Sequence, residues 1–188
     1  MSSQPYDARH LYTVEEFAAL PEDNSMRYEL QEGLIVVSPR PALPHMIVLN
    51  ELWGQLNPQV TDELIVVTEI DVDLQLDPPM VRIPDLVIVH ARAARTPGIV
   101  TASDVLLAVE VISPSSVRAD TKVKPMEYAD AGIPHLWLVD PQHPVTATAY
   151  RLVDGHYEES QRAEQTLHVQ EPCELRVELG SLLPAKYR

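Results

Sequence analysis

Two acidic residues stand where a charge is costly. Glu110 lies inside the stretch "VLLAVEVI" that starts at Val105, in which all seven remaining residues are apolar. Asp85 directly precedes the apolar run "LVIV". Moving a carboxylate out of water costs several kcal/mol even after the protein relaxes. Each of these acids is therefore expected to have a cation, a metal ion or a bound proton as its partner.

Strand geometry can bring the two carboxylates together. Side chains alternate between the two faces of a strand, so Glu110 shares a face with Ala108 and Ile112. If this strand pairs with the strand that starts at Asp85, the two carboxylates converge, and they repel each other unless positive charge lies between them. Mg²⁺ suits such a place, because it takes hard oxygen ligands, commonly one or two carboxylates, and leaves positions for water or phosphate oxygens.

The elements that must position these residues are of mixed type. Thr13 and Glu16 form a capping-box pattern before a short helix, and the residues around Glu32 and Gly33 read as a β-hairpin. The remaining pattern predicts a helix from His45 to Pro58, strands at 63–76, 84–90, 105–113 and 135–140, a helix between Asp120 and Gly132, and a hairpin with its turn at Asp154–Gly155. We therefore expect an α/β chain, in the sense of an α+β mixed sheet flanked by helices, with extra β-hairpins.

Length and composition restrict the class of protein. The 188 residues suit one domain over 1–188, with a core at about 25–165. The single Cys173 excludes an internal disulfide, and the N-terminal residues resemble neither a signal peptide nor a membrane span, so we expect a soluble cytoplasmic protein with no membrane partner. The 28 Asp and Glu residues outnumber the 14 Lys and Arg residues. This balance argues against a protein that coats nucleic acid nonspecifically, and any such contact must be local.

Six stretches carry a resemblance to a known family. They are "RYELQEG", "SPRPALPH", "IPDLVIV", "VEVISPSS", "DTKVKPMEYADAGIPHLWLVD" and "YRLVDGHY", and the similarity runs in order from about Thr13 to "LRVELGSLLP". In these stretches the chain resembles the small bacterial restriction endonuclease family, a branch of the PD-(D/E)XK phosphodiesterase superfamily. The resemblance implies a restriction-endonuclease-like core, a mixed β-sheet flanked by helices.

The resemblance also implies roles for particular residues. Asp85 corresponds to the acid of the PD motif and Glu110 to the acid of the second half-motif, and both would be metal ligands, with the backbone carbonyl of Val111 as a third. Glu29 and His45 match further family positions that face the same cleft. The implied enzyme is a Mg²⁺-dependent endodeoxyribonuclease, with Mn²⁺ as the alternative metal, that hydrolyses phosphodiester bonds in nucleic acid, with DNA as the expected substrate.

The lysine of this motif is displaced. It normally follows the acid by two residues, where this chain has Ile112, and in the family it is commonly supplied from the next helix. Lys124 aligns best with that position, and Lys122 is the second candidate. Pro125 complicates the choice, because proline inside a helix loses a hydrogen bond and clashes with the preceding turn. A helix that starts at Pro125 would leave the reach of Lys124 open.

Other readings stay open on the sequence alone. A nuclease-like fold that has lost catalysis would serve as a binding or regulatory module, and exposed strands would allow a homodimer. Residue by residue, Asp85 can cap a turn, Glu110 can form a structural ion pair, and His45 and Glu29 can bond to backbone. The acids at positions 69, 71 and 73 alternate with apolar residues, which is typical of a strand with one solvated face. The scattered histidines lack zinc-site spacing, and no serine-hydrolase turn is present.

Overall fold

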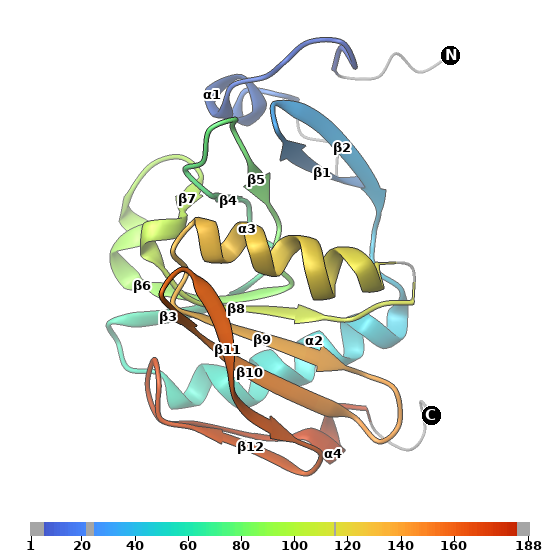
Figure 1. The fold of residues 1–188 in the computed structure, drawn as a ribbon, viewed down its shortest axis with the longest axis vertical. Coiled ribbons are helices and arrows are strands. Elements are labelled where there is room, and N and C mark those ends of the chain that lie inside the picture. Colours follow the sequence, from blue (N-terminus) through green and yellow to red (C-terminus); the bar gives the residue numbers. More distant parts are fainter. Residues whose placement is uncertain (1–5, 22–24, 115, 184–188) are drawn as a thin grey trace.

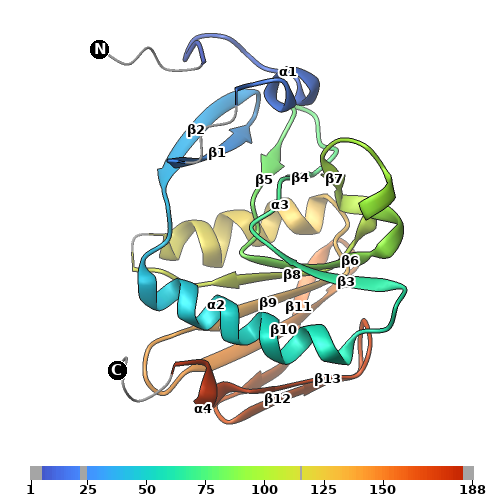
Figure 2. The same ribbon diagram turned by 180° about the vertical axis from the view of Figure 1, so that it is seen from behind.

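A six-stranded mixed sheet forms the centre of the computed structural model, which describes residues 6–21, 25–114 and 116–183. Its strand order is β11-β10-β9-β8-β6-β3, and only β8 and β9 run parallel among its pairs. The strands are β3 (Leu64–Thr68), β6 (Leu86–His90), β8 (Val105–Val111), β9 (His135–Asp140), β10 (Thr146–Val153) and β11 (His156–Ala163). Figure 1 shows helix α3 (Lys124–Asp130) across the front of this sheet, and Figure 2 shows helix α2 (Leu43–Leu56) across the back.

A five-stranded sheet lies at one end of the central sheet (Figure 1). Its order is β2-β1-β5-β4-β7, and its strands are β1 (Met26–Gln31), β2 (Leu34–Pro39), β4 (Val72–Asp73), β5 (Val81–Arg82) and β7 (Val100–Thr101). Helix α1 (Val14–Ala18) packs on it through Phe17. Strand β5 ends at Arg82 and β6 of the central sheet begins at Leu86. The short segment between them, which contains Asp85, therefore crosses from one sheet to the other.

The C-terminal hairpin completes the face that α2 covers. It consists of β12 (Thr166–Val169) and β13 (Leu175–Glu178) and is followed by α4 (Leu179–Leu182). Short helical turns fill the connections: η1 (Asn57–Gln59), η2 (Ala91–Arg95), η3 (Ala102–Asp104) and the π-helical η4 (Ala119–Val123). None of the helices in the described ranges has the length and apolar character needed to cross a membrane.

Side-chain alternation along β8 separates two apolar layers. Val109 and Val111 join the layer under α2, whereas Ala108 and Ile112 join the layer under α3. The period of two along a strand places Glu110 on the α3 side, as the sequence predicts. The capping box of Thr13 is also confirmed, since its side chain and that of Glu16 each accept a backbone N–H.

One prediction about the elements needs correction, and one alternative is decided. The stretch 63–76 is not one strand, because β3 ends at Thr68 and β4 belongs to the other sheet. The chain turns at Glu69, whose φ is 51°, a left-handed conformation that few residues other than glycine adopt. The helix predicted between Asp120 and Gly132 is present, and it does not take the start at Pro125 that the sequence left open. Helical residues start at Val117, and Pro125 follows the π turn as an N-terminal residue of α3, where its missing N–H costs little.

Candidate active site

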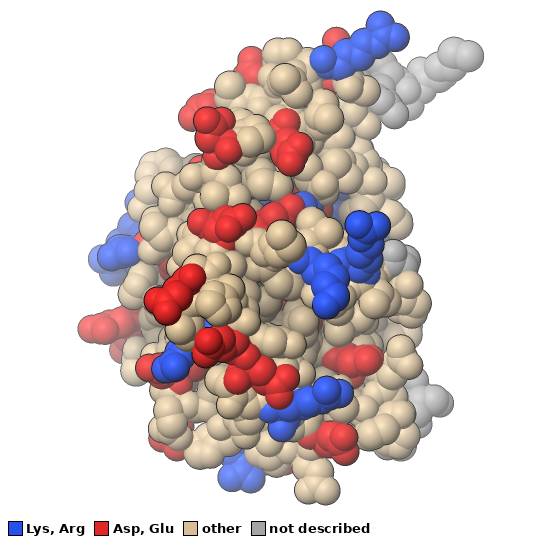
Figure 3. Space-filling model, viewed as in Figure 1, with Lys and Arg blue, Asp and Glu red and all other residues tan. Residues whose placement is uncertain are grey.

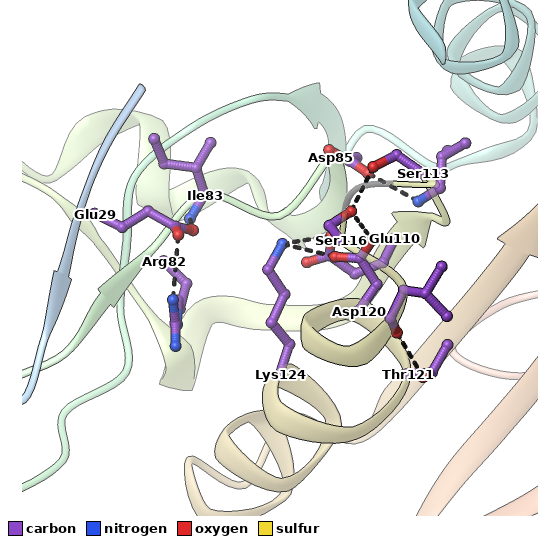
Figure 4. A network of polar contacts seen from close by, with 12 residues as sticks. Glu29, Arg82, Ile83, Asp85, Glu110, Ser113, Ser116, Asp120, Thr121 and Lys124 are labelled. Atoms are coloured by element: carbon purple, nitrogen blue, oxygen red, sulfur yellow. Dashed lines mark hydrogen bonds and ion pairs between the residues drawn. The ribbon is translucent and has the colours of Figure 1, made fainter. Parts of the chain in front are cut away.

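Asp85 lies in the crossing segment between the two sheets and is only 3% exposed. Its Oδ2 accepts a hydrogen bond from the backbone N–H of Val111 at 2.8 Å, and its Oδ1 lies 3.4 Å from the guanidinium Nη1 of Arg27. The interpretation of Asp85 as the cap of its own turn therefore has no support from these contacts. The carboxylate is bound to β8 and β1, and it lies beside Glu110 in Figure 4.

Glu110 is 1% exposed and both of its carboxylate oxygens accept hydrogen bonds from α3. The ammonium of Lys124 donates to Oε2 at 2.7 Å, and the hydroxyl of Tyr128 donates to Oε1 at 2.6 Å. The ion pair that the sequence left open for Glu110 is therefore present, with Lys124 as the partner. Sequence reasoning missed Tyr128, although it stands four residues after Lys124 and so on the same side of the helix.

The buried acids have opposite pKa shifts. Burial raises the pKa of Glu110 to about 7, and the carboxylate of Asp85 adds to the rise while Lys124 opposes it. Burial also acts to raise the pKa of Asp85, but His45, Lys124 and the Val111 N–H outweigh it and hold this pKa below its usual value. Two carboxylates with shared surroundings and pKa values pushed apart are a common feature of active sites.

Lys124 is buried beside these carboxylates, at 8% exposure, and keeps its positive charge. Burial lowers the pKa of its ammonium, but the nearby carboxylates, of which Glu110 acts most strongly, raise it above its usual value. Asp120, one turn earlier in the helix, lies 3.6 Å from the same ammonium and accepts a hydrogen bond from the hydroxyl of Ser116. Figure 4 shows Lys124 pointing toward Glu110 and Asp120 from the helix.

Lys122 is placed on another side of the helix. It is exposed and lines a groove of about 500 Å³ between α3 and the β10–β11 hairpin, together with Met126 and Tyr157. The structure thus brings Lys124, and not Lys122, into contact with the acid of the second half-motif. Lys122 lies in η4, two residues and thus about half a helical turn before Lys124, so its side chain is directed away from the Glu110 contact.

Glu29 and His45 both contact the crossing segment. Glu29 accepts a hydrogen bond from the Ile83 N–H at 3.0 Å and another from Arg82 at 3.1 Å. His45, in the first turn of α2, places Nε2 3.3 Å from Oδ1 of Asp85. This buried nitrogen has no hydrogen-bond partner of good geometry among the described residues, so its contact with Asp85 is a close electrostatic approach.

Three buried or half-buried cations each lie between two of the acids. The sequence had pointed to only one of them, Lys124. Arg27 lies between Asp85 and Glu69, Arg82 between Glu29 and Glu127, and Lys124 between Glu110 and Asp120; the contacts have N···O distances of 2.6 to 3.7 Å. Six carboxylates against three cations leave a formal local charge of −3 when all are ionised. A cation entering this region would offset that charge.

The donor set of the site fits Mg²⁺ or Mn²⁺. Asp85 and Glu110 supply carboxylate oxygens, and Mg²⁺ is commonly bound by one or two carboxylates with water completing its shell. Val111 adjoins both, because it follows Glu110 in the strand and binds Asp85 through its N–H. Within the described part of the chain, no group of three or more His, Cys, Asp or Glu side chains is arranged to hold a metal. The two carboxylates are hard oxygen donors of the kind that Mg²⁺ and Mn²⁺ prefer.

The surface around α3 carries more acidic than basic side chains. Figure 3 shows Asp and Glu residues spread over this face, with Lys and Arg in small separate groups. Of the basic residues near the two motif strands, Arg92 is 66% exposed in its side chain and pairs with Asp104 at 2.6 Å. Any contact with a polyanion must therefore use local groups of basic residues and not a continuous positive face.

The fold is restriction-endonuclease-like, and comparison with known proteins supports this. The chain resembles the crystal structure of a "putative nuclease belonging to DUF820" from Anabaena variabilis ATCC 29413, with a TM-score of 0.69 and 21% sequence identity over 92% of this chain and 99% of that one. None of the curated proteins matches the chain.

The family follows from the sequence match. The model of the Uma2 family, described as "Putative restriction endonuclease", matches residues 14–181, so the chain belongs to this family. The resemblance to restriction endonucleases that the sequence motifs indicate is thereby confirmed. Membership supports a nuclease function.

Proposed function

We propose that the protein is a metal-dependent endonuclease that hydrolyses phosphodiester bonds in DNA, with Mg²⁺ or Mn²⁺ as its cofactor. The observation that carries this proposal is the convergence of three buried charged groups at one end of β8. Asp85 is held by the Val111 N–H at 2.8 Å, and Lys124 reaches Glu110 at 2.7 Å. Membership of the restriction endonuclease family supports the same reaction.

Asp85, Glu110 and the backbone carbonyl of Val111 are the residues that would hold the ion. A bound Mg²⁺ in such a site polarises the phosphate and lowers the pKa of a bound water. The protein supplies the fixed geometry. The Val111 N–H and Arg27 fix the carboxylate of Asp85, while Tyr128 fixes that of Glu110.

Lys124 is the proposed catalytic cation. Its ammonium is charged, because neighbouring carboxylates keep its pKa above the usual value. A fixed positive charge in a site of low dielectric stabilises negative charge that develops on a phosphate far better than it would in water. The same ammonium can orient the attacking water, and His45, beside Asp85, is the proposed second group that contacts that water or the phosphate.

Basic residues close to the site are proposed to bind the nucleic acid backbone. Arg118 and Lys122 are exposed on the helical segment that carries Lys124. Because the whole chain has a formal charge of −14, such contacts are local, and binding should weaken as salt increases with a slope set by the few phosphates contacted.

A second candidate is a nuclease-like module that binds a partner without cleaving it. The observation in its favour is that both oxygens of Glu110 already accept hydrogen bonds, from Lys124 and Tyr128. An ion at Asp85 and Glu110 must share or displace one of these donors. If no donor is displaced, the cluster is a structural element held together by its own ion pairs.

The two candidates differ in a direct assay. Supercoiled, linear and single-stranded DNA, with RNA for comparison, are incubated with the protein in Mg²⁺, Mn²⁺ or Ca²⁺. Cleavage should require Mg²⁺ or Mn²⁺ and be absent in Asp85→Ala. The matched control is Asp140→Ala, which removes an acid at the end of β9 that binds only its own turn in the described structure, and should keep activity.

Calorimetry distinguishes a protein that binds no metal ion from one that binds the ion but does not cleave the nucleic acids tested. Titration of Mn²⁺ into the wild-type protein should show saturable binding that Asp85→Ala removes and Asp140→Ala retains. Absence of binding together with absence of cleavage would favour the second candidate. Binding without cleavage would direct the search to other nucleic acids.

A further inference from the structure

Arg82 connects the five-stranded sheet to the helix that carries Lys124. It is the last residue of β5 and is 3% exposed. Its Nε donates to Oε2 of Glu127 at 2.7 Å and its Nη2 donates to Oε1 at 2.6 Å. Such a two-point contact fixes orientation as well as distance, because the guanidinium fork and the carboxylate are both planar.

The third donor of Arg82 extends the connection to β1. Nη1 donates to Oε2 of Glu29 at 3.1 Å, while Oε1 of Glu29 accepts the N–H of Ile83 at 3.0 Å. Glu29 thus holds both the side chain of Arg82 and the first residue of the segment that leads to Asp85. Figure 4 shows Glu29 and Arg82 on the opposite side of Lys124 from Asp85.

Arg82 and Glu127 each lie close in the chain to a residue of the proposed site. Glu127 is three residues after Lys124 on α3, and Asp85 is three residues after Arg82. The Arg82–Glu127 pair therefore joins the element that delivers the ammonium to the segment that delivers the first carboxylate. Neither Arg82 nor Glu127 contacts Asp85, Glu110 or Lys124 in the contacts of the described residues.

We propose that Arg82 and Glu127 are positioning residues that hold α3 so that Lys124 meets the carboxylates of the site. This inference rests on the nuclease function proposed above. Lysine at position 82 keeps the charge but, as a single point donor, cannot make the two-point contact. The pair therefore acts through Lys124 and not through substrate or metal.

Cleavage under saturating Mg²⁺ tests the proposal in Arg82→Lys and Glu127→Gln. Each should lower kcat by about 10- to 100-fold, as does loss of the partners that orient metal ligands, while KM changes little. In the Lys124→Ala background neither variant should lower kcat further, because the group that they position is gone. Glu178→Gln, which removes the acid of the exposed Arg176–Glu178 pair, is the matched control and should leave kcat unchanged.

A spectroscopic readout keeps this test separate from that of the proposed function. In protein labelled with ¹³C at lysine Cε, the Lys124 signal is identified by its loss in Lys124→Ala. Arg82→Lys and Glu127→Gln should shift or broaden it, whereas Glu178→Gln should not. If the wild-type protein cleaves nothing, the proposed function fails and this spectrum still decides whether the pair positions Lys124.

Three results would overturn the positioning role. The first is an unchanged Lys124 signal in both folded variants, and the second is a further loss of kcat in the Lys124→Ala background. The third is unfolding of both variants, which would assign the pair to stability alone. A fall in kcat with unchanged KM, together with a shifted Lys124 signal, supports the role.

Discussion

Replacement of Lys124 by alanine tests the proposed mechanism most directly. The change removes the ammonium that lies 2.7 Å from Glu110 and 3.6 Å from Asp120. Removing one fixed group that stabilises charge in the transition state costs about 10² to 10³ in rate. We expect kcat to fall by that factor, which corresponds to about 3 to 4 kcal/mol at roughly 1.4 kcal/mol for each tenfold change.

The same replacement lowers stability, and the size of the loss depends on pH. Removing one partner of a buried ion pair costs about 3 to 5 kcal/mol when the other charge stays. Glu110 can avoid part of this cost by binding a proton, since burial already raises its pKa to about 7 and loss of Lys124 removes its strongest opposing influence. When folding raises the pKa of a carboxyl group, the protein loses stability as pH rises from the pKa of that group in the unfolded state to its pKa in the folded state. The variant should therefore be closest to wild type in stability below pH 6 and furthest from it above pH 8.

The comparison variant is Lys122→Ala, which removes the same charge from the same helical segment at the exposed groove. Lys122 is a proposed contact of the nucleic acid backbone, so its loss should weaken DNA binding and leave the cleavage rate at saturating DNA unchanged. Single-turnover cleavage with saturating Mg²⁺ gives the rates, and thermal unfolding at pH 6 and pH 8 gives the stabilities. A large loss confined to Lys122→Ala would transfer the role to that residue. Unchanged rates in both variants and in the double variant would remove the displaced-lysine mechanism.

Three further outcomes are expected. Glu110→Gln should abolish metal-dependent cleavage while circular dichroism shows a retained fold, because the amide keeps the shape and loses the charge that holds the ion; a fully active variant would exclude Glu110 as an essential ligand. Tyr128→Phe leaves Oε1 of Glu110 without its donor and should lower the free energy of unfolding by about 1 to 3 kcal/mol in denaturant titrations. Burial raises the pKa of Glu110 to about 7, so Mn²⁺ binding should weaken as pH falls below 7 and should release protons at pH 7. Calorimetry in buffers of different ionisation enthalpy measures this proton release. Equal binding at pH 6 and pH 8 would contradict the assignment of Glu110 as a ligand.

The sequence is most informative where the signal is local. The capping box of Thr13 and the β1–β2 hairpin involve residues a few positions apart, and both are present in the structure. The orientation of Glu110 is also a local matter, since alternation along one strand decides it. Patterns fail where the chain changes direction without a glycine or proline. The alternation through 63–76 continues across Glu69, so nothing in it marks the point at which the chain leaves one sheet for the other.

The contacts that surround the two acids depend on sheet pairing and are harder to predict. Arg27 and Asp85 are 58 residues apart, and Arg82 and Glu127 are 45 apart. Only the pairing of β1 with β5 and the packing of α3 bring them together. One signal was available, because an arginine at the end of an apolar strand carries the same desolvation cost as Glu110 and must also have partners.

The choice between the two lysines follows from the helix itself. Positions two apart in a helical segment lie about half a turn apart, so Lys122, in η4, and Lys124, at the start of α3, cannot both reach Glu110. Tyr128 identifies the correct side, because a residue four positions after Lys124 lies above it on the same face, and its burial fixes that face against β8. The π turn from Ala119 to Val123 widens the helix just before Pro125, and the helical path continues through the proline without turning Lys124 away. The proline thus changes the form of the helix and leaves the direction of the lysine intact, which is why the rate loss is expected in Lys124→Ala and not in Lys122→Ala.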